Sequence, residues 1–283
     1  MLERSGSELA WRFDDGVVRF PVAEWIRLGG RAAAVTDVAV RGADATITYE
    51  SGRLVLGLTH RFDREAGALV QALELTVPAA TPHLLLDVRA VPVLPDPIDW
   101  LTVPGVFYGD NDLTSDHAGY PRGMKRDWSS RADAAVCPGV HLAGATRGHA
   151  AFLERDRPGI EGFSPGAEGH ADLLGVGWVH GPAKARAARF TFPCQEEPLA
   201  YRRPEVLPPA VTPRLDAPAG AVIRFSILHF VTPGGRGGYH RAARAMAQRG
   251  RPAAVDAGRA RIADTARLFA TCLRESHFWP GVG

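Results

Sequence analysis

The chain has 283 residues, enough to bury about 75% of the surface of its unfolded state without support from disulfides or metals. Hydrophobic residues make up 46% of it and charged residues 23%, which excludes a disordered or fibrous chain. Lys and Arg number 33 against 31 for Asp and Glu, and the basic residues are scattered, so nucleic acid is not an expected partner.

The sequence carries no sign of export or membrane insertion. Charged side chains stand near the start of the chain where a secretory signal needs a continuous apolar run, and no stretch reaches the roughly eighteen apolar residues that cross a bilayer. Cys137, Cys194 and Cys272 are far apart, with no pair at zinc or redox spacing, and are expected to be reduced. We expect a soluble, cytoplasmic protein that does not bind membranes.

Short apolar and alternating runs dominate the first part of the chain and predict antiparallel strands. The clearest runs are residues 45–49, 53–62, 68–77 and 84–93. Residues 63–67 predict a hairpin loop, and the register that follows puts Leu69, Gln71, Leu73 and Leu75 on one face. Because no crossover helices separate the runs, they favour a sandwich over a parallel sheet.

The middle of the chain interrupts this pattern. Residues 95–128 are rich in Pro, Gly, Asp, Arg and aromatic residues and predict a long ordered loop. Further strands are predicted at residues 150–154, 173–180, 186–192 and 221–232, with an extended, Pro-rich connection at 198–218.

Glycine-rich residues 233–238 separate strands from helices and mark the predicted domain boundary. Tyr239, Ala242, Ala243 and Met246 share one face of a short helix, and Ile262, Ala266, Phe269 and Leu273 share one face of a second. We therefore predict a mainly β chain, an antiparallel super-β-sandwich over 1–232, followed by a linker and the start of a helical region over 233–283. Because this helix pair lacks obvious partners, a helical domain beyond Gly283 or a partner subunit is expected to continue the layer.

The loop at 95–128 holds the candidate binding residues. Sugars combine apolar C–H faces with many hydroxyls, so their sites combine aromatic platforms with carboxylate, amide and guanidinium groups carried on loops. The substrate-binding candidates are Trp100, Tyr108, Asp110, Asn111, Asp112, Arg122 and Trp128. The alternative is that Phe107 and Tyr108 anchor the loop to the core while Asp110, Asn111 and Asp112 cap turns.

Other motifs give weaker signals. Glu154 and Glu161, like the adjacent Glu196 and Glu197, are carboxylates of the kind that could flank a glycosidic bond, or else solvated edge charges. The histidines lack short metal-ligand spacing, Ser164 lacks a nucleophile motif, and the glycines at 234–238 lack a phosphate-binding context and indicate a hinge. No metal or cofactor is expected, and catalytic residues stay unassigned.

The order of parts carries a resemblance. A large sandwich, the loop between Trp100 and Trp128, the strand end at 190–193, a Gly-rich linker and amphipathic helices follow one another. This layout resembles the front of bacterial glycoside hydrolases and polysaccharide lyases that join a super-β-sandwich to an (α/α) toroid. The resemblance implies that the toroid carries most catalytic acids, while the sandwich contributes a loop to the rim of the cleft. Since this chain has only the opening helices, its catalytic residues are expected outside it.

Two functions therefore stand as hypotheses. The first is the β-sandwich part of a glycosidase-like, carbohydrate-active protein, with an oligosaccharide or polysaccharide as partner and hydrolase activity if a helical catalytic domain follows. The second is a non-catalytic sandwich that docks another domain or subunit.

Overall fold

The structure is a computed structural model and describes residues 2–5, 8–13, 16–21, 26–90, 92, 94–108, 127–154, 158–162, 174–180, 186–196 and 215–249. The chain divides into two compact units, Met1–Ala243 and Arg244–Gly283. In the described part of the chain, no helix is long and apolar enough to cross a membrane.

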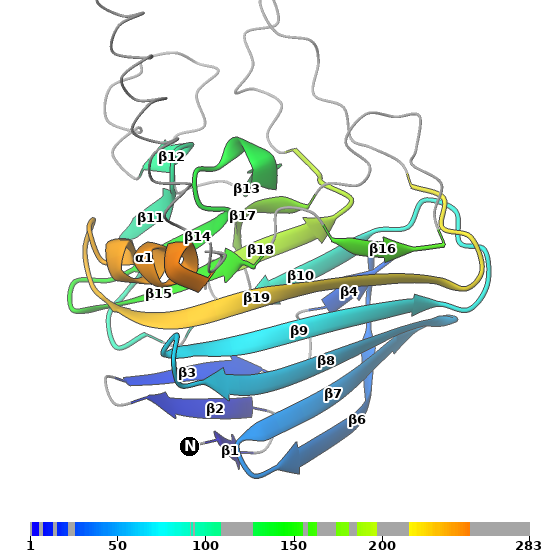
Figure 1. Ribbon diagram of the computed structural model, residues 1–283, viewed down its shortest axis with the longest axis horizontal. Helices are drawn as coiled ribbons and strands as arrows, with labels where there is room; N and C mark the ends of the chain where they lie inside the picture. Colours follow the sequence, from blue (N-terminus) through cyan, green and yellow to red (C-terminus); the bar gives the residue numbers. More distant parts are fainter. Residues whose placement is uncertain are drawn as a thin grey trace, which may run out of the picture. The chain divides into compact units, whose positions relative to one another are not determined.

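Strands make up most of the first unit (Figure 1). Their bounds are β1 Leu2–Ser5, β2 Glu8–Phe13, β3 Gly16–Pro21, β4 Ile26–Leu28, β5 Arg31–Ala32, β6 Ala34–Arg41, β7 Asp44–Ser51, β8 Leu54–Asp63, β9 Ala68–Val77, β10 Leu86–Ala90, β11 Trp100–Val103, β12 Phe107–Tyr108, β13 Trp128–Arg131, β14 Gly139–Ala143, β15 Arg147–Leu153, β16 Gly159–Glu161, β17 Gly175–His180, β18 Arg186–Phe192 and β19 Ala221–Pro233. A 3-10 turn covers Ala132–Ala134, and the helix α1 covers Tyr239–Arg249.

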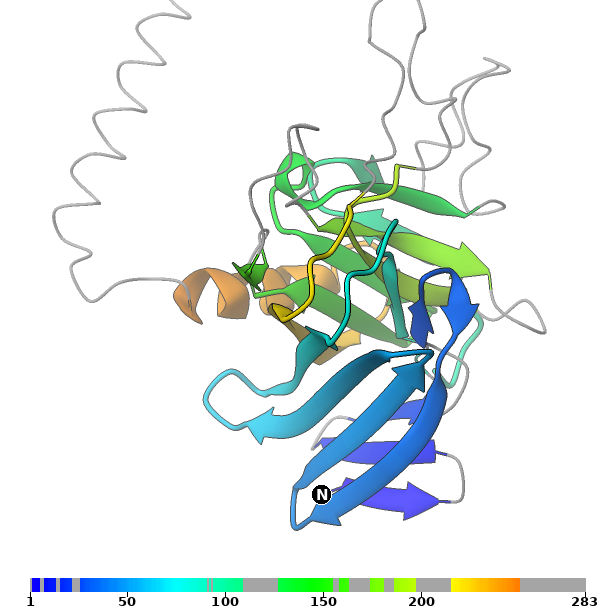
Figure 2. The same cartoon turned by 90° about the vertical axis from the view of Figure 1, so that its right-hand side faces the viewer.

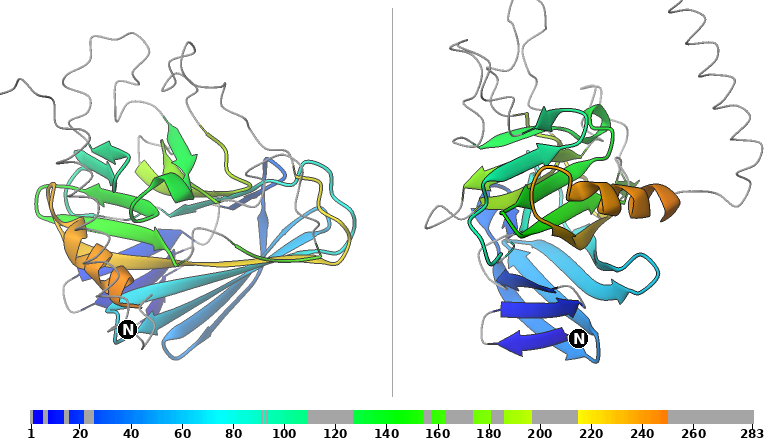
Figure 3. Two further views of the ribbon diagram at one scale, coloured as in Figure 1. Left: turned by 45° about the horizontal axis from the view of Figure 1, so that its top comes forward. Right: turned by 90° about the vertical axis from the view of Figure 1, so that its left-hand side faces the viewer.

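The described strands form three antiparallel sheets. The front sheet has ten strands in the order β12-β11-β14-β15-β19-β9-β8-β7-β6, with β16 paired to β19. The back sheet has six strands in the order β13-β17-β18-β10-β4-β5, and the N-terminal sheet has the three strands β1-β2-β3. The back sheet packs against the front sheet at β14, which contacts β17 and β18. Figures 2 and 3 show the N-terminal sheet (dark blue) beside β6–β8. The fold is thus an antiparallel β-sandwich, as the sequence predicts.

The core lies between the layers, because alternate residues of each strand point to opposite faces. On β9, Leu69, Gln71, Leu73 and Leu75 are all buried, as the predicted register requires, whereas Glu74 on the other face is exposed. We call the face of the front sheet that carries these buried residues its inner face, and the opposite one its outer face. Phe190 and Phe192 of β18 join the same core from the back sheet.

Tight turns connect the first strands of the front sheet. Gly42 and Gly52 are the first of two residues in the turns β6–β7 and β7–β8, and both have positive φ, 63° and 62°. A glycine with positive φ at this position is typical of the turns that match the twist of a hairpin. In the predicted loop at 63–67, the Asp63 carboxylate accepts backbone hydrogen bonds from Glu65 and Ala66 at 3.0 and 3.1 Å.

The predicted long loop at 95–128 differs in part from the structure. Residues 100–103 and 107–108 form β11 and β12, which pair with each other, and β11 also pairs with β14 at the edge of the front sheet. The sequence does not predict these strands because each is short and because Pro104 and Gly105 separate them. β11 belongs to the sheet because it pairs with β14, about forty residues later in the sequence, and such a distant pairing gives no local signal.

The helix α1 confirms the predicted change from strand to helix after the glycine-rich segment. Its first turn belongs to the first compact unit, where Ala242 is buried and the Tyr239 ring lies 6.0 Å from that of His141 on the outer face. The second predicted helix and the expected helical layer lie outside the described residues. The division at 232/233 therefore stays a prediction.

Candidate functional site

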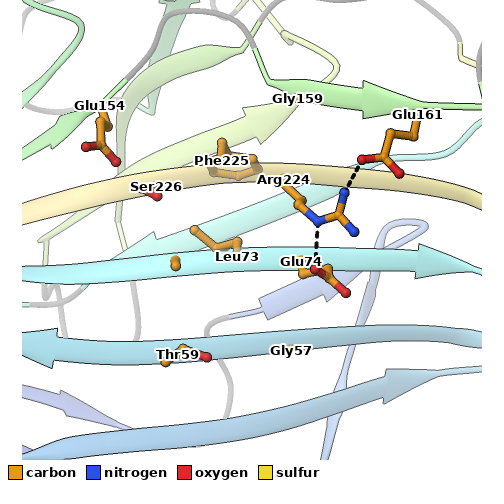
Figure 4. Close-up of a pocket in the computed structure, with 11 residues that line it drawn as sticks. Gly57, Thr59, Leu73, Glu74, Glu154, Gly159, Glu161, Arg224, Phe225 and Ser226 are labelled. Carbon is orange, nitrogen blue, oxygen red and sulfur yellow. Dashed lines mark hydrogen bonds and ion pairs between the residues drawn. The ribbon is translucent and has the colours of Figure 1, made fainter. Parts of the chain in front are cut away.

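A groove opens on the outer face of the front sheet, with a volume of about 660 Å³ (Figure 4). We call it the outer groove. Its lining comes from β8, β9, β19, β16 and the residue after β15: Gly57, Thr59, Ala72, Leu73, Glu74, Glu154, Gly159, Glu161, Arg224, Phe225 and Ser226. The side chains of Leu73 and Phe225 belong to the core, so the outward-pointing side chains of the groove are polar, small or absent.

Strand register arranges these residues in two rows across the sheet. In the first row Glu74 of β9 stands opposite Gly57 of β8 and Arg224 of β19, and Arg224 stands opposite Gly159 of β16. In the second row, Ala72 lies between Thr59 and Ser226, and the backbone N–H of Glu154 donates to the Ser226 carbonyl at 2.9 Å. Gly57 and Gly159 in the first row and Ala72 in the second have little or no side chain to cover the sheet, and this creates the groove.

Arg224 links two carboxylates at one side of the groove. Its Nε donates to Oε2 of Glu74 at 2.7 Å, and its Nη1 donates to Oε1 of Glu161. The hydrogen bond that Arg224 donates to Glu74 raises the pKa of the Arg224 guanidinium, so this cation keeps its charge. The three side chains are 44%, 54% and 66% exposed, so the pairs orient the charged groups and contribute little to stability.

The groove brings together two of the carboxylates that the sequence singles out, Glu154 and Glu161. In Figure 4 Glu154 lies near Ser226 of β19. Glu161 is hydrogen-bonded to Arg224, which lies two residues before Ser226 on β19. Glu196 follows β18 in the back sheet and does not line the groove, and Glu197 lies outside the described residues. Glu74 and Arg224 were not expected at a site, because nothing in a sequence predicts a contact across 150 residues.

The loop candidates are only partly described. Trp100 begins β11 and is half-buried; its Nε1 donates to Oγ1 of Thr102 at 2.7 Å, and the Arg236 guanidinium carbon lies 4.6 Å from its ring centre. Tyr108 ends β12, paired with Thr102. Of Tyr108 the backbone alone is described. Asp110, Asn111, Asp112 and Arg122 lie outside the described residues.

Trp128 lies in the core. It is 3% exposed and stacks on Trp178, with ring centres 4.9 Å apart and planes at 17°. The stacked faces of Trp128 and Trp178 hold the edge of the back sheet together.

A cluster of buried imidazoles lies on the inner face of the front sheet, away from the groove. His149 Nε2 lies 3.1 Å from His229 Nδ1, His229 Nε2 lies 3.0 Å from Gln71 Oε1, and Gln71 Nε2 lies 3.1 Å from His60 Nε2. We call these four residues the histidine chain. Burial lowers the pKa of His60 and of His149 to about 3 and that of His229 well below its usual range, so the three rings are neutral.

The described ranges contain no group of three or more His, Cys, Asp or Glu side chains that could hold a metal ion. Burial raises the pKa of the Cys137 thiol to about 11 and that of the Cys194 thiol to about 12, so neither is an activated nucleophile. The chemistry that the outer groove offers is therefore hydrogen bonding and charge.

No protein-family model matches the sequence, and no curated protein matches it. The structure is similar to the Slr1438 protein of Synechocystis sp. PCC 6803, with a TM-score of 0.36 and 9% identity over 78% of this chain and 72% of that chain. It is also similar to the α-galactosidase of Lactobacillus brevis, with a TM-score of 0.38 and 11% identity over 87% of this chain and 31% of the galactosidase. These similarities assign no family.

Proposed function

We propose that the chain is the β-sandwich part of a carbohydrate-active, glycosidase-like protein, and that the outer groove binds a saccharide. The observation that carries this proposal is the groove itself. Its volume of about 660 Å³ lies within the range of small-molecule sites, about 300 to 1,000 Å³, and its outward side chains are hydrogen-bonding groups on paired strands.

The polar groups suit a polyhydroxylated ligand. The carboxylate oxygens of Glu74, Glu154 and Glu161 accept hydrogen bonds, and the hydroxyls of Thr59 and Ser226 both donate and accept them. Hydrogen bonds that involve a charged group are about twice as strong as those between neutral groups, so carboxylates are effective partners for sugar hydroxyls. Because strands carry all but one of these side chains, little ordering is required on binding.

The test compares two arginine variants by a glycan array followed by calorimetry. Arg224→Met removes the cation that orients Glu74 and Glu161, and we expect it to weaken saccharide binding about tenfold while changing the melting temperature little. Arg131→Met is the matched control, because Arg131 at the end of β13 pairs at 2.8 Å with Asp133 in the following 3-10 turn, outside the groove. Equal effects of the two variants on binding would contradict the assignment of the groove.

The loop after Trp100 is proposed as a second saccharide-contact region, separate from the outer groove. Tyr108→Ala or Asp110→Ala is expected to weaken oligosaccharide binding without a change in melting temperature. If these variants fail to fold, their side chains belong to the core. A wild-type protein that binds no glycan and forms a discrete complex in light scattering would favour the docking function instead.

A further inference from the structure

The strand β6 forms an open edge of the front sheet. It is the last strand in the order of that sheet, and in the described part of the chain no strand pairs with its other side. Figure 1 shows β6 as the lowest strand of the sheet. An open edge presents backbone N–H and C=O groups that pair readily with another strand, so the residues of β6, Ala34–Arg41, form a possible site of strand addition.

The backbone groups that point away from the sheet belong to alternate residues of β6. Arg41 and Asp44 are paired across the two-residue turn, and in a β-turn the carbonyl of the first residue accepts a hydrogen bond from the N–H of the fourth. Successive residues of an antiparallel strand direct their backbone groups to opposite sides, so Ala39, like Arg41, faces β7. The N–H and C=O groups of Val38 and Val40 therefore face the open side.

The same two valines leave apolar surface at the edge. Val38 stands opposite Ile47 and Val40 opposite Ala45. Ile47 and Ala45 are buried in the core, so both valines lie on the inner face of the sheet. Val38 packs against the core, whereas Val40 is 39% exposed although it lies on the inner face. A strand added at this edge would cover Val40.

A second copy of β6 matches this edge in one antiparallel register. Asp37 and Arg41 are exposed on the outer face, four residues apart, with Ala39 midway between them. When two copies pair about a two-fold axis at Ala39, Asp37 of each copy stands opposite the partner's Arg41. On the inner face, Val38 of each copy stands opposite the partner's Val40, and these are the residues whose backbone groups face the open side. Charge, apolar surface and backbone groups are thus complementary in the same register.

Neighbouring registers lack this match. An axis at Asp37 or at Arg41 puts like charges opposite each other, which is destabilising. An axis at Val38 or at Val40 puts both charges opposite uncharged residues. The β-bulge between Val35 and Asp37, a common way to protect an edge, lies at the end of the five residues that pair, so it limits the length of the contact without blocking it.

We infer that β6 is a homodimer interface, at which a second copy of the chain extends the front sheet by antiparallel pairing of residues 37–41. This inference goes beyond the proposed function and does not rest on it. An interface of five residues on each side is small, so the dimer is expected to be weak, with a dissociation constant of about 100 µM. Because paired strands share their faces, the outer grooves of the two copies open on the same side of the joined sheet.

Sedimentation of the full chain at concentrations from about 10 µM to about 1 mM measures the dimerisation, and charge reversal assigns it to β6. Asp37→Arg puts two cations opposite each other at both charge contacts, and Arg41→Asp puts two anions there. Each variant alone should therefore dimerise about tenfold more weakly than the wild type. In a heterodimer of the two variants each contact again joins opposite charges, so an equimolar mixture should regain the wild-type affinity to within about threefold.

Glu65→Arg is the matched control. Glu65 is an exposed residue in the turn between β8 and β9, away from β6, and its reversal should leave the dissociation constant unchanged. Because Asp37 and Arg41 are also exposed, the melting temperatures of all three variants should stay close to that of the wild type. A chain that stays monomeric at about 1 mM would overturn the inference. So would a dimer that both β6 variants leave intact, or one that mixing them does not restore.

Discussion

The outer groove depends on positions that have almost no side chain. Gly57 and Gly159 are the two end residues of the first row, and Ala72 lies in the middle of the second row. A Cβ atom added at Gly57 would have its nearest neighbour at 3.9 Å, the Glu74 carbonyl oxygen, so the protein itself has room for a larger residue there. The space is left to whatever occupies the groove.

Gly57→Ala should therefore separate stability from binding. Alanine loses less conformational entropy than glycine in a strand, so the free energy of unfolding should stay equal or rise by about 0.5 to 1 kcal/mol. The added methyl group projects from the floor of the groove and should weaken saccharide binding. Urea unfolding and calorimetry on the same variant measure both effects.

Gly148→Ala is the contrasting variant, at a glycine that does pack tightly. A Cβ atom there would lie 2.6 Å from both Nε2 of His141 and Oγ1 of Thr232, which are hydrogen-bonded to each other at 2.9 Å. We expect a loss of about 1 to 3 kcal/mol in unfolding free energy from overpacking. If Gly57→Ala destabilises as much as Gly148→Ala, the open space at Gly57 does not exist in solution.

Asp87 gives a second prediction at the level of single residues. It is 4% exposed in the back sheet and pairs with Arg89 at 3.0 Å and with Arg189 at 3.3 Å. Asp87→Asn removes the charge that compensates two guanidinium groups, and it should cost about 3 kcal/mol of unfolding free energy, measured in urea. Asp133→Asn breaks a more exposed pair, with side chains 29% and 28% exposed, and should cost less than about 1 kcal/mol. Similar losses would mean that Asp87 is hydrated.

The groove was only partly predictable from residue types. Glu154 and Glu161 are recognisable as carboxylates near apolar strands, and the structure puts both in the lining. In the sequence Glu74 and Arg224 read as charged residues on the solvent-facing side of apolar strands. The pairing of β9 with β19 makes them neighbours. Trp128 was indistinguishable from an exposed aromatic, because its burial depends on Trp178 in the neighbouring strand.

At the level of strands, the histidine chain connects four neighbours of the front sheet: β15, β19, β9 and β8. The amide of Gln71 sets its direction. Its Nε2 donates to His60, its Oε1 accepts from Nε2–H of His229, and Nδ1 of His229 then accepts from Nε2–H of His149. The contacts of His60 and His229 require these two rings to be neutral, since protonation of either one would place two donors face to face.

Gln71→Met should show how much this polar connection contributes. Methionine has a similar size, but it leaves His60 and His229 each without the amide partner, and we expect a loss of about 2 to 4 kcal/mol of unfolding free energy. Leu69→Met, two residues earlier on the same buried face, loses no hydrogen bond and should cost less than about 1.5 kcal/mol. Equal losses in urea unfolding would show that the chain acts as packing alone.

The strands were largely predictable because alternation and turn chemistry are local. Residues 68–77 and 186–192 match β9 and β18 at both ends, and 221–232 differs from β19 by one residue. The short strands β11 and β12 were missed because too few residues alternate to give a signal, and their partners are distant in sequence. The sequence did not predict which strands form the front sheet and which form the back sheet, because neighbouring strands in each sheet are often distant in sequence.

For the molecule as a whole, the buried histidines make stability depend on pH. Burial lowers the pKa of His141 to about 4, with a further contribution from His240, and it lowers those of His60 and His149 to about 3. In the unfolded chain these groups titrate near 6.5, so the unfolded state binds more protons than the folded state between about pH 6.5 and pH 3. Their neutral forms fit the fold fully above this range, and stability is lost as the pH falls through it.

The expected loss is about 2 kcal/mol for each of these histidines between about pH 7 and pH 5, and urea unfolding at a series of pH values measures it. His141→Asn should reduce the slope of unfolding free energy against pH by close to one proton, or about 1.4 kcal/mol per pH unit, because its ring is buried against Thr232 and Tyr239. His83→Gln is the control, since the His83 side chain is 65% exposed and should leave the slope unchanged. A wild-type slope near zero between about pH 6 and pH 5 would show that the buried rings already take up protons in the folded state.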